Sequence, residues 1–166
     1  MTIGYLCGKF MPATLGHARL ISFAAEKCDK LIVNIIAQPG EPFTSISYRK
    51  DPLVDYFKDC DISKINFIYS YVETYPSHLR HGQPESSIWW GNWVKENFGK
   101  IDKVFSSENY GTLFAQTIGA ENVIYDIDRS LTPISATMCR ENPIKYMDYI
   151  LPKARKFMIE LFANNQ

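Results

Sequence analysis

Short apolar runs that alternate with segments of helical length are the feature that most constrains the fold of this chain. The runs are rich in β-branched and aromatic residues and cover 3–7, 31–37, 65–72, 104–106 and 123–127. Strands that alternate with helices are typical of a parallel sheet with right-handed crossovers and helices on both faces. The sequence therefore predicts an α/β protein, with a Rossmann-like doubly wound parallel sheet of about five strands.

The segments between these runs predict helices over 17–28, 47–58, 86–98 and 110–118. Pro143 and Pro152 each stand where a helix can begin, and an apolar stripe follows the second proline, so we expect two closing helices. The stretch 73–85 contains two prolines and a glycine and predicts a long loop of the kind that covers ligands.

Length and composition indicate one ordinary domain over residues 1–166, large enough to bury a core without disulfides or structural metals. The formal net charge is zero, which disfavours generic binding of nucleic acid. The four cysteines form no CxxC pair and are expected to be reduced and buried. The N-terminal residues lack the pattern of a secretory signal, and no apolar run is long enough for a membrane span, so we expect a cytoplasmic protein without a membrane partner.

The first predicted strand leads directly into a glycine-bearing turn, 8–17, and then into a helix. In open α/β sheets such a turn presents unpaired helix N–H groups to an anion. Gly8 lets the chain turn sharply and Gly16 allows close approach of a phosphate. Thr14 and His17 lie three residues apart and can face one ligand, and Lys9 adds a positive charge. The turn therefore predicts a phosphate site.

A second polar element, 133–140, stands near the other end of the chain. Ser135 can act as a helix N-cap or a phosphate donor, and Thr137 adds a hydroxyl in the first turn. Arg140 offers a forked donor for phosphate oxygens.

The two elements together resemble the signature of the nucleotidyltransferase superfamily. Gly8-Lys9-Phe10-Met11-Pro12 followed by Thr14-Leu15-Gly16-His17 resembles its (His or Thr)-x-Gly-His region, and Ile134 to Arg140 resembles its Ile-Ser-x-Thr-x-x-Arg motif. Thr14 stands where many members have histidine.

Three further segments are similar to one group within that superfamily. They are Ser106-Ser107-Glu108-Asn109-Tyr110-Gly111, Trp90-x-x-Trp93 and Arg140-Glu141-Asn142-Pro143-x-Lys145-Tyr146. The group is the nicotinamide mononucleotide adenylyltransferase domain of the bacterial bifunctional NAD-biosynthesis regulator, and the resemblance covers nearly the whole chain. It implies the reaction of ATP with nicotinamide mononucleotide to give NAD and pyrophosphate, with Mg²⁺ accompanying ATP and no protein metal site.

The resemblance also implies roles for individual residues. The catalytic set would be His17, Thr14, Lys9 and Arg140. ATP would be bound by Gly8, Phe10, Gly16, Ser135, Thr137 and Asp128. Nicotinamide mononucleotide would be bound by Trp90, Trp93, Glu108 and Asn109.

Several of these roles compete with plain structural explanations. A tryptophan such as Trp90 can stack on a cationic pyridinium ring or simply pack in the core. Glu108 and Asn109 can contact ribose hydroxyls or cap a helix, and Asp128 can contact the adenosine half or form a surface turn.

His78 and His81 have a spacing that can hold a metal on a helix, but nothing completes the site, so a solvated loop is favoured.

Two rival functions remain beside the implied reaction. A sister transferase for phosphopantetheine or glycerol phosphate would keep the phosphate motifs without needing the tryptophan helix. A non-catalytic sensor of NAD or ATP would be expected to have lost His17 or Arg140, and both are present. The oligomeric state stays open, and a homo-oligomer is compatible with the sequence.

Overall fold

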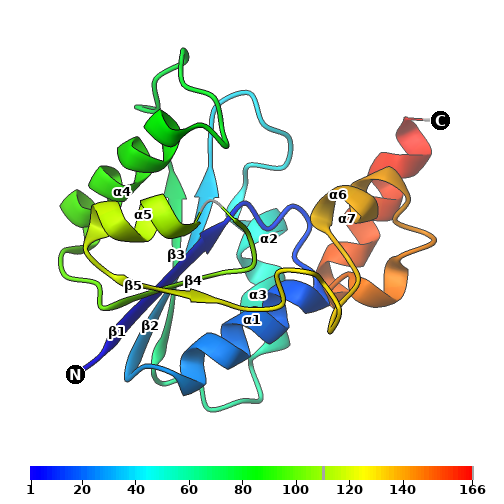
Figure 1. Ribbon diagram of the computed structural model, residues 1–166. Helices are drawn as coiled ribbons and strands as arrows, with labels where there is room; N and C mark the ends of the chain where they lie inside the picture. The colour runs from blue at the N-terminus through cyan, green and yellow to red at the C-terminus, as the bar shows by residue number, and fades with distance from the viewer. Residues whose placement is uncertain (110, 166) are drawn as a thin grey trace.

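A five-stranded parallel sheet forms the centre of the computed structural model, which describes residues 1–109 and 111–165 (Figure 1). The strands are β1 (Ile3–Gly8), β2 (Lys30–Ala37), β3 (Ile65–Tyr71), β4 (Lys103–Ser106) and β5 (Glu121–Ile124). Their order is β3-β2-β1-β4-β5. This is a doubly wound order whose direction reverses between β1 and β4. The predicted Rossmann-like fold class is confirmed.

Helices cover both faces of the sheet. They are α1 (Leu15–Glu26), α2 (Ile46–Arg49), α3 (Asp51–Tyr56), α4 (Pro84–Phe98), α5 (Gly111–Ile118), α6 (Ala136–Glu141), the 3₁₀ helix η1 (Met147–Tyr149) and α7 (Pro152–Asn164). Helices α1 and α3 pack on one face and α4 and α5 on the other, while α6 and α7 lie together beyond the sheet, as Figure 1 shows.

Alternating side chains of the central strands supply the two cores. In β1, Leu6 points toward α1, whereas Tyr5 points toward α4 and α5. In β2, Leu31, Val33 and Ile35 pack on the α1 side. Strand β1 therefore contributes to an apolar core on each face, as expected for a parallel sheet covered on two sides.

Strands β1 and β4 separate early. They pair only at Gly4–Lys103 and Tyr5–Val104, although both strands continue beyond those positions. On its other side, β1 pairs with β2 as far as Gly8–Ile35. The carboxyl ends of β1 and β4 therefore diverge at the reversal point of the sheet, where α/β proteins bind ligands.

The predicted last strand, 123–127, is displaced. The observed strand β5 ends at Ile124, although the Tyr125 N–H still donates to the Ser106 carbonyl at 2.9 Å. Asp126 then adopts a left-handed φ of 50°, and its carboxylate accepts the N–H groups of Leu131 and Thr132. These bonds turn the chain out of the sheet.

Two helix predictions need correction at prolines. The predicted helix 47–58 is two helices, α2 and α3, because Pro52 has no N–H to continue the hydrogen-bond ladder. Pro143 does not begin a helix. Helix α6 ends at Glu141, since the residue before a proline avoids the helical region, and the next element is η1. Pro152 does begin α7, as predicted.

Four further predictions concern a loop, the start of a helix, the cysteines and membrane spans. The loop predicted over 73–85 is observed between β3 and α4, which begins at Pro84. The beginning of the predicted helix 110–118 lies outside the described residues at Tyr110. The cysteines form no disulfide; Cys28 and Cys139 are buried as predicted, whereas Cys7 is only half-buried and Cys60 is exposed. Within residues 1–109 and 111–165, no helix has the length and apolarity needed to cross a membrane.

Candidate functional site

A cleft of about 470 Å³ opens where β1 and β4 diverge. Eleven of the residues that the sequence nominates line it, namely Gly8, Lys9, Phe10, Thr14, Gly16, His17, Trp90, Glu108, Ser135, Thr137 and Arg140. They come from the turn after β1, the helix α4, the end of β4 and the helix α6. The fold thus brings together segments that are more than 120 residues apart in the chain.

The turn after β1 is shaped by Phe10 rather than by its glycines. Phe10 has a φ of 49°, whereas neither Gly8 nor Gly16 adopts a left-handed φ. A side chain in that region costs on the order of 1 kcal/mol or more, so the surrounding packing must hold the turn. The prediction that Gly8 makes the sharp turn is therefore wrong. A Cβ added at Gly16 would meet protein atoms only at 3.5 Å or beyond, so packing against the protein does not require a glycine there.

Thr14 and His17 cap helix α1 reciprocally. The Thr14 hydroxyl accepts the His17 backbone N–H at 3.4 Å, and Nδ1 of His17 accepts the Thr14 backbone N–H at 3.0 Å. Because Nδ1 uses its lone pair as an acceptor, the proton of the neutral ring lies on Nε2. The capping geometry therefore makes Nε2 of His17 a hydrogen-bond donor.

The charge state of His17 follows from its surroundings. Desolvation in the wall of the cleft, assisted by the positive charge of Arg129, lowers the pKa of His17 to about 4. The ring also packs edge-on against Phe10, with centroids 4.8 Å apart. At neutral pH the ring is therefore uncharged, and it can supply a directed proton donor without adding a full positive charge.

Helix α6 is tied to the turn after β1 by Arg140. Its Nη1 donates to the Met11 carbonyl at 2.6 Å, and its Nη2 donates to the Thr137 hydroxyl at 3.1 Å. Ser135 caps the helix by accepting the Met138 N–H at 3.1 Å, so its predicted capping role is confirmed. Hydroxyl and guanidinium groups from α6 thus stand beside the turn, in a position to share one anion with it.

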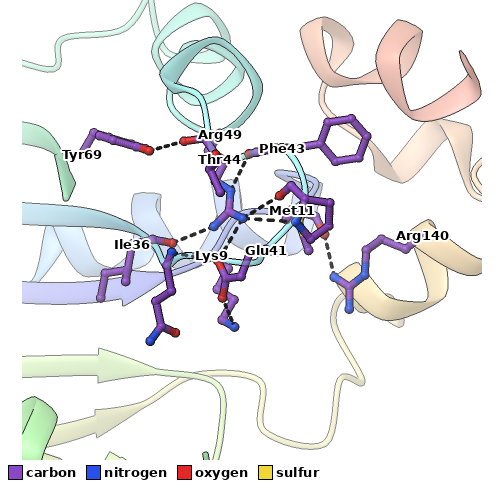
Figure 2. Close-up of polar contacts among 11 residues, drawn as sticks. Lys9, Met11, Ile36, Glu41, Phe43, Thr44, Arg49, Tyr69 and Arg140 are labelled. Carbon is purple, nitrogen blue, oxygen red and sulfur yellow. Dashed lines mark hydrogen bonds and ion pairs between the residues drawn. The ribbon is translucent and has the colours of Figure 1, made fainter. Parts of the chain in front are cut away.

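Lys9 lies at the mouth of the cleft and pairs with Glu41 from the loop after β2 (Figure 2). Glu41 in turn contacts the buried Arg49 of α2 at 3.0 Å. Sequence reasoning missed both residues, because a lone acidic residue in a loop and an arginine in a helix carry no local signal.

Aromatic side chains form the wall of the cleft on the α4 side. Trp90 lies nearly parallel to Tyr75, with centroids 5.2 Å apart, and edge-on to Trp89 and Trp93. Tyr75 and Trp90 both line the cleft, whereas Trp93 does not and packs against Phe98 in the core. Tyr75 is a residue that sequence reasoning missed, although the loop predicted over 73–85 includes it.

Past β5, the structure turns Asp126 and Arg129 toward the cleft and leaves Asp128 out of its lining. The Asp128 carboxylate accepts the Ser130 N–H at 3.1 Å, which is the surface-turn alternative. Arg129 donates to the Ile134 carbonyl at 2.7 Å.

Glu108 and Asn109 follow β4 and are both exposed. Glu108 lines the main cleft, whereas Asn109 lines only an adjoining open depression of about 570 Å³, which Glu108 and Arg129 share.

No three side chains of His, Cys, Asp or Glu gather as a metal site within the described part of the chain. His78 and His81 belong to no such group.

The fold and the cleft together define a Rossmann-like α/β protein in which the turn after β1, the hydroxyl groups of α6 and an aromatic wall converge at the reversal point of the sheet. Comparison with known proteins finds a relative of this chain. The chain is 27% identical over 181 aligned positions, 98% of its length, to the trifunctional NAD biosynthesis/regulator protein NadR of Escherichia coli strain K12. It spans only 42% of that relative's length.

Solved structures of related fold include NadR itself. A crystal structure of NadR in complex with NAD and AMP-PNP superposes with a TM-score of 0.63 at 19% identity, covering 92% of this chain and 45% of that one. A bifunctional NMN adenylyltransferase/ADP ribose pyrophosphatase from Francisella tularensis, complexed with AMP and a manganese ion, gives a TM-score of 0.62 at 16% identity, over 98% and 49%. No family model matches the chain. The predicted resemblance to the bacterial NAD-biosynthesis regulator is confirmed by the match to NadR, and the solved structures share the fold.

Proposed function

We propose that this protein is an adenylyltransferase of NAD synthesis that joins ATP and nicotinamide mononucleotide to give NAD and pyrophosphate. The observation that carries the proposal is the convergence of the turn 8–17, the helix α6 and Trp90 on one cleft. Similarity to NadR and to a fold neighbour named as an NMN adenylyltransferase supports the adenylyl-transfer chemistry. The choice of nicotinamide mononucleotide over its acid form is part of the proposal.

The reaction proceeds in line and without a covalent enzyme intermediate. A phosphate oxygen of the mononucleotide attacks the α-phosphorus of ATP, and the bond from that phosphorus to the oxygen bridging toward the β-phosphorus breaks. Pyrophosphate leaves with the electron pair of that bond. Catalysis then consists of positioning two anions and stabilising the charge that develops between them.

The residues of the cleft suit these tasks. Nε2 of His17 carries a proton at neutral pH and would donate it as a hydrogen bond to an α-phosphate oxygen in the transition state. Lys9, Thr14, Ser135, Thr137 and Arg140 would bind the phosphates, and Gly8, Phe10 and Gly16 would form the turn around them. The reaction needs no general base, because the attacking phosphate is already an anion.

Mg²⁺ would arrive with ATP. This ion usually keeps several waters and binds substrate phosphates together with one or two carboxylates, so it needs no cage of protein ligands. Two carboxylates, those of Glu108 and Asp126, are among the groups that line the cleft, which fits that mode. The manganese ion in the Francisella tularensis structure supports a divalent ion in the reaction.

The aromatic wall would receive the nicotinamide end. A pyridinium ring is flat and cationic, and indole is the best partner for such a ring. Trp90 is the proposed platform, with Tyr75 stacked on one of its faces in the structure. Glu108 is within the same cleft and would face the ribose hydroxyls. Trp93, Asn109 and Asp128 do not line the cleft, and we assign them no direct contact.

The test is pyrophosphate release from ATP and Mg²⁺ in parallel reactions that contain nicotinamide mononucleotide, its acid form, phosphopantetheine or glycerol phosphate. We expect release with the first compound, and NAD in the product. Release only with phosphopantetheine or glycerol phosphate would assign the protein to a sister transferase. No release with any of the four, while ATP still binds, would indicate a sensor.

A further inference from the structure

Arg49 is a buried cation that contacts Met11 in the turn after β1, next to the cleft. Its side chain is 0% exposed. Three of its bonds reach backbone carbonyls: Nε donates to Phe43 at 2.7 Å, Nη1 to Ile36 at 2.8 Å and Nη2 to Pro42 at 2.9 Å. In Figure 2, the Arg49 guanidinium of α2 bonds to the end of β2 at Ile36 and to the loop after β2 at Phe43. Arg49 therefore fixes the path of the loop 38–45.

A buried guanidinium needs an anion, and Glu41 supplies it. Glu41 Oε2 lies 3.0 Å from Arg49 Nη2 and also accepts the Gln38 N–H at 3.1 Å. Burial acts to raise the pKa of Glu41, but the ion pairs with Lys9 and Arg49 and the Gln38 hydrogen bond outweigh burial and lower it. Glu41 is therefore an anchored carboxylate that stays ionised.

The other carboxylate oxygen of Glu41 contacts Lys9, which lines the cleft. Oε1 pairs with the ammonium of Lys9, whose side chain is 52% exposed. An ammonium has three N–H donors, and the pair with Glu41 leaves further donors for a ligand. An exposed lysine otherwise samples many rotamers, and fixing it when a ligand binds costs conformational entropy. The anchored carboxylate removes that freedom before a ligand arrives.

We propose that Glu41 is a positioning residue, which, held by Arg49, sets the ammonium of Lys9 where it meets the phosphates of ATP. This inference rests on the proposed function, because it takes Lys9 as a phosphate ligand. The opposite role is physically distinct: a carboxylate that only competed with phosphate for Lys9 would weaken ATP binding. The two roles predict opposite signs for the same substitution.

The test is a double-mutant cycle with Lys9→Met, Glu41→Gln and the double variant. We would measure kcat and KM for ATP in the NAD-forming reaction, and the dissociation constant of a non-hydrolysable ATP analogue by calorimetry. Glutamine keeps an oxygen for Arg49 and Gln38 but removes the charge that holds Lys9. We expect Glu41→Gln to lower kcat/KM for ATP by roughly ten- to a hundredfold, as for misplaced catalytic groups. It should also weaken binding of the analogue.

The decisive result is the behaviour of the double variant. If Glu41 acts through Lys9, Glu41→Gln should change neither kcat/KM nor analogue binding once Lys9 is methionine. Additive losses, or tighter analogue binding in Glu41→Gln alone, would overturn the proposal. Asp55→Asn is the matched control, since Asp55 pairs with Lys58 and Lys153 outside the cleft, and it should leave all these constants unchanged.

Two further arrangements keep the test decisive. If Glu41→Gln does not fold, Glu41→Asp replaces it: the charge remains but lies one methylene short of Lys9, and a smaller loss is expected that again vanishes with Lys9→Met. If the wild-type protein makes no dinucleotide, the proposed function fails by itself. The cycle measured by analogue binding then decides the role of Glu41 alone, and independent effects of the two residues would refute it.

Discussion

Three features of the surroundings of His17 determine which ring nitrogen carries the proton and keep the ring uncharged. The Thr14 N–H occupies Nδ1, the wall of the cleft removes water, and Arg129 disfavours a second positive charge. Replacing His17 by alanine should lower kcat by about 10² to 10³, because one preorganised donor to a developing charge is lost. Steady-state assays should show little change in KM for the mononucleotide. Near-normal kcat would remove His17 from the mechanism.

The lowered pKa of His17 also makes the stability of the folded protein depend on pH. The folded value of about 4 lies below the ordinary 6.5, so the unfolded chain binds a proton that the folded chain does not between these values. The contribution of this group to the free energy of unfolding should therefore be constant well above pH 6.5 and fall as the pH drops toward 4, by about 3 kcal/mol over the full window. Urea unfolding at pH 4.5 and 7 would measure the fall.

His17→Gln is the control for that measurement, since an amide does not titrate in this range, and the fall should be smaller in this variant. Turnover of the wild-type protein should not titrate near pH 6.5 through His17. A titration at that pH which disappears in His17→Gln would contradict the neutral donor.

At the scale of elements, helix α4 and the loop before it meet through Tyr75 and Trp90. Trp90 lines the cleft and also packs against the core formed with α5. Trp90→Ala should therefore raise KM for the mononucleotide with little change in KM for ATP, and should also destabilise the protein by about 3 kcal/mol. Trp93→Phe, which alters the same helix outside the cleft, is the control and should leave both KM values unchanged. An unaltered mononucleotide KM in Trp90→Ala would make Trp90 a core residue only.

At the scale of the whole molecule, the C-terminal elements hold the turn after β1 from behind. The Leu151 N–H donates to the Ala13 carbonyl at 3.0 Å, and Thr14 forms an isolated bridge with Ile150. Met158 of α7 is fully buried against Ile150 and Cys139. Met158→Ala should lower the free energy of unfolding by about 2 to 5 kcal/mol, measured by chemical denaturation. Ile144→Ala, at a 58% exposed site, should change it by less than about 0.5 kcal/mol.

The sequence by itself determined the fold class and the neighbourhood of the site. Apolar runs that alternate with helical segments specify a parallel sheet, because a strand covered by helices on both faces is apolar along its length. The loop after the first strand of such a sheet lies at the edge where ligands bind. The cap at Ser135 could also be predicted, because a helix N-cap depends on residues only a few positions apart.

Only the tertiary structure decided the rest. It moved the end of β5, because the Asp126 carboxylate bonds backbone groups five and six residues away. In it, Trp93 packs against Phe98 whereas Trp90 lines the cleft, and this difference depends on which segments pack against α4. It joined Lys9 to Arg49 through Glu41, over a span of 40 residues. Contacts of this kind depend on where separate segments meet in space, and no local pattern in the sequence encodes that meeting.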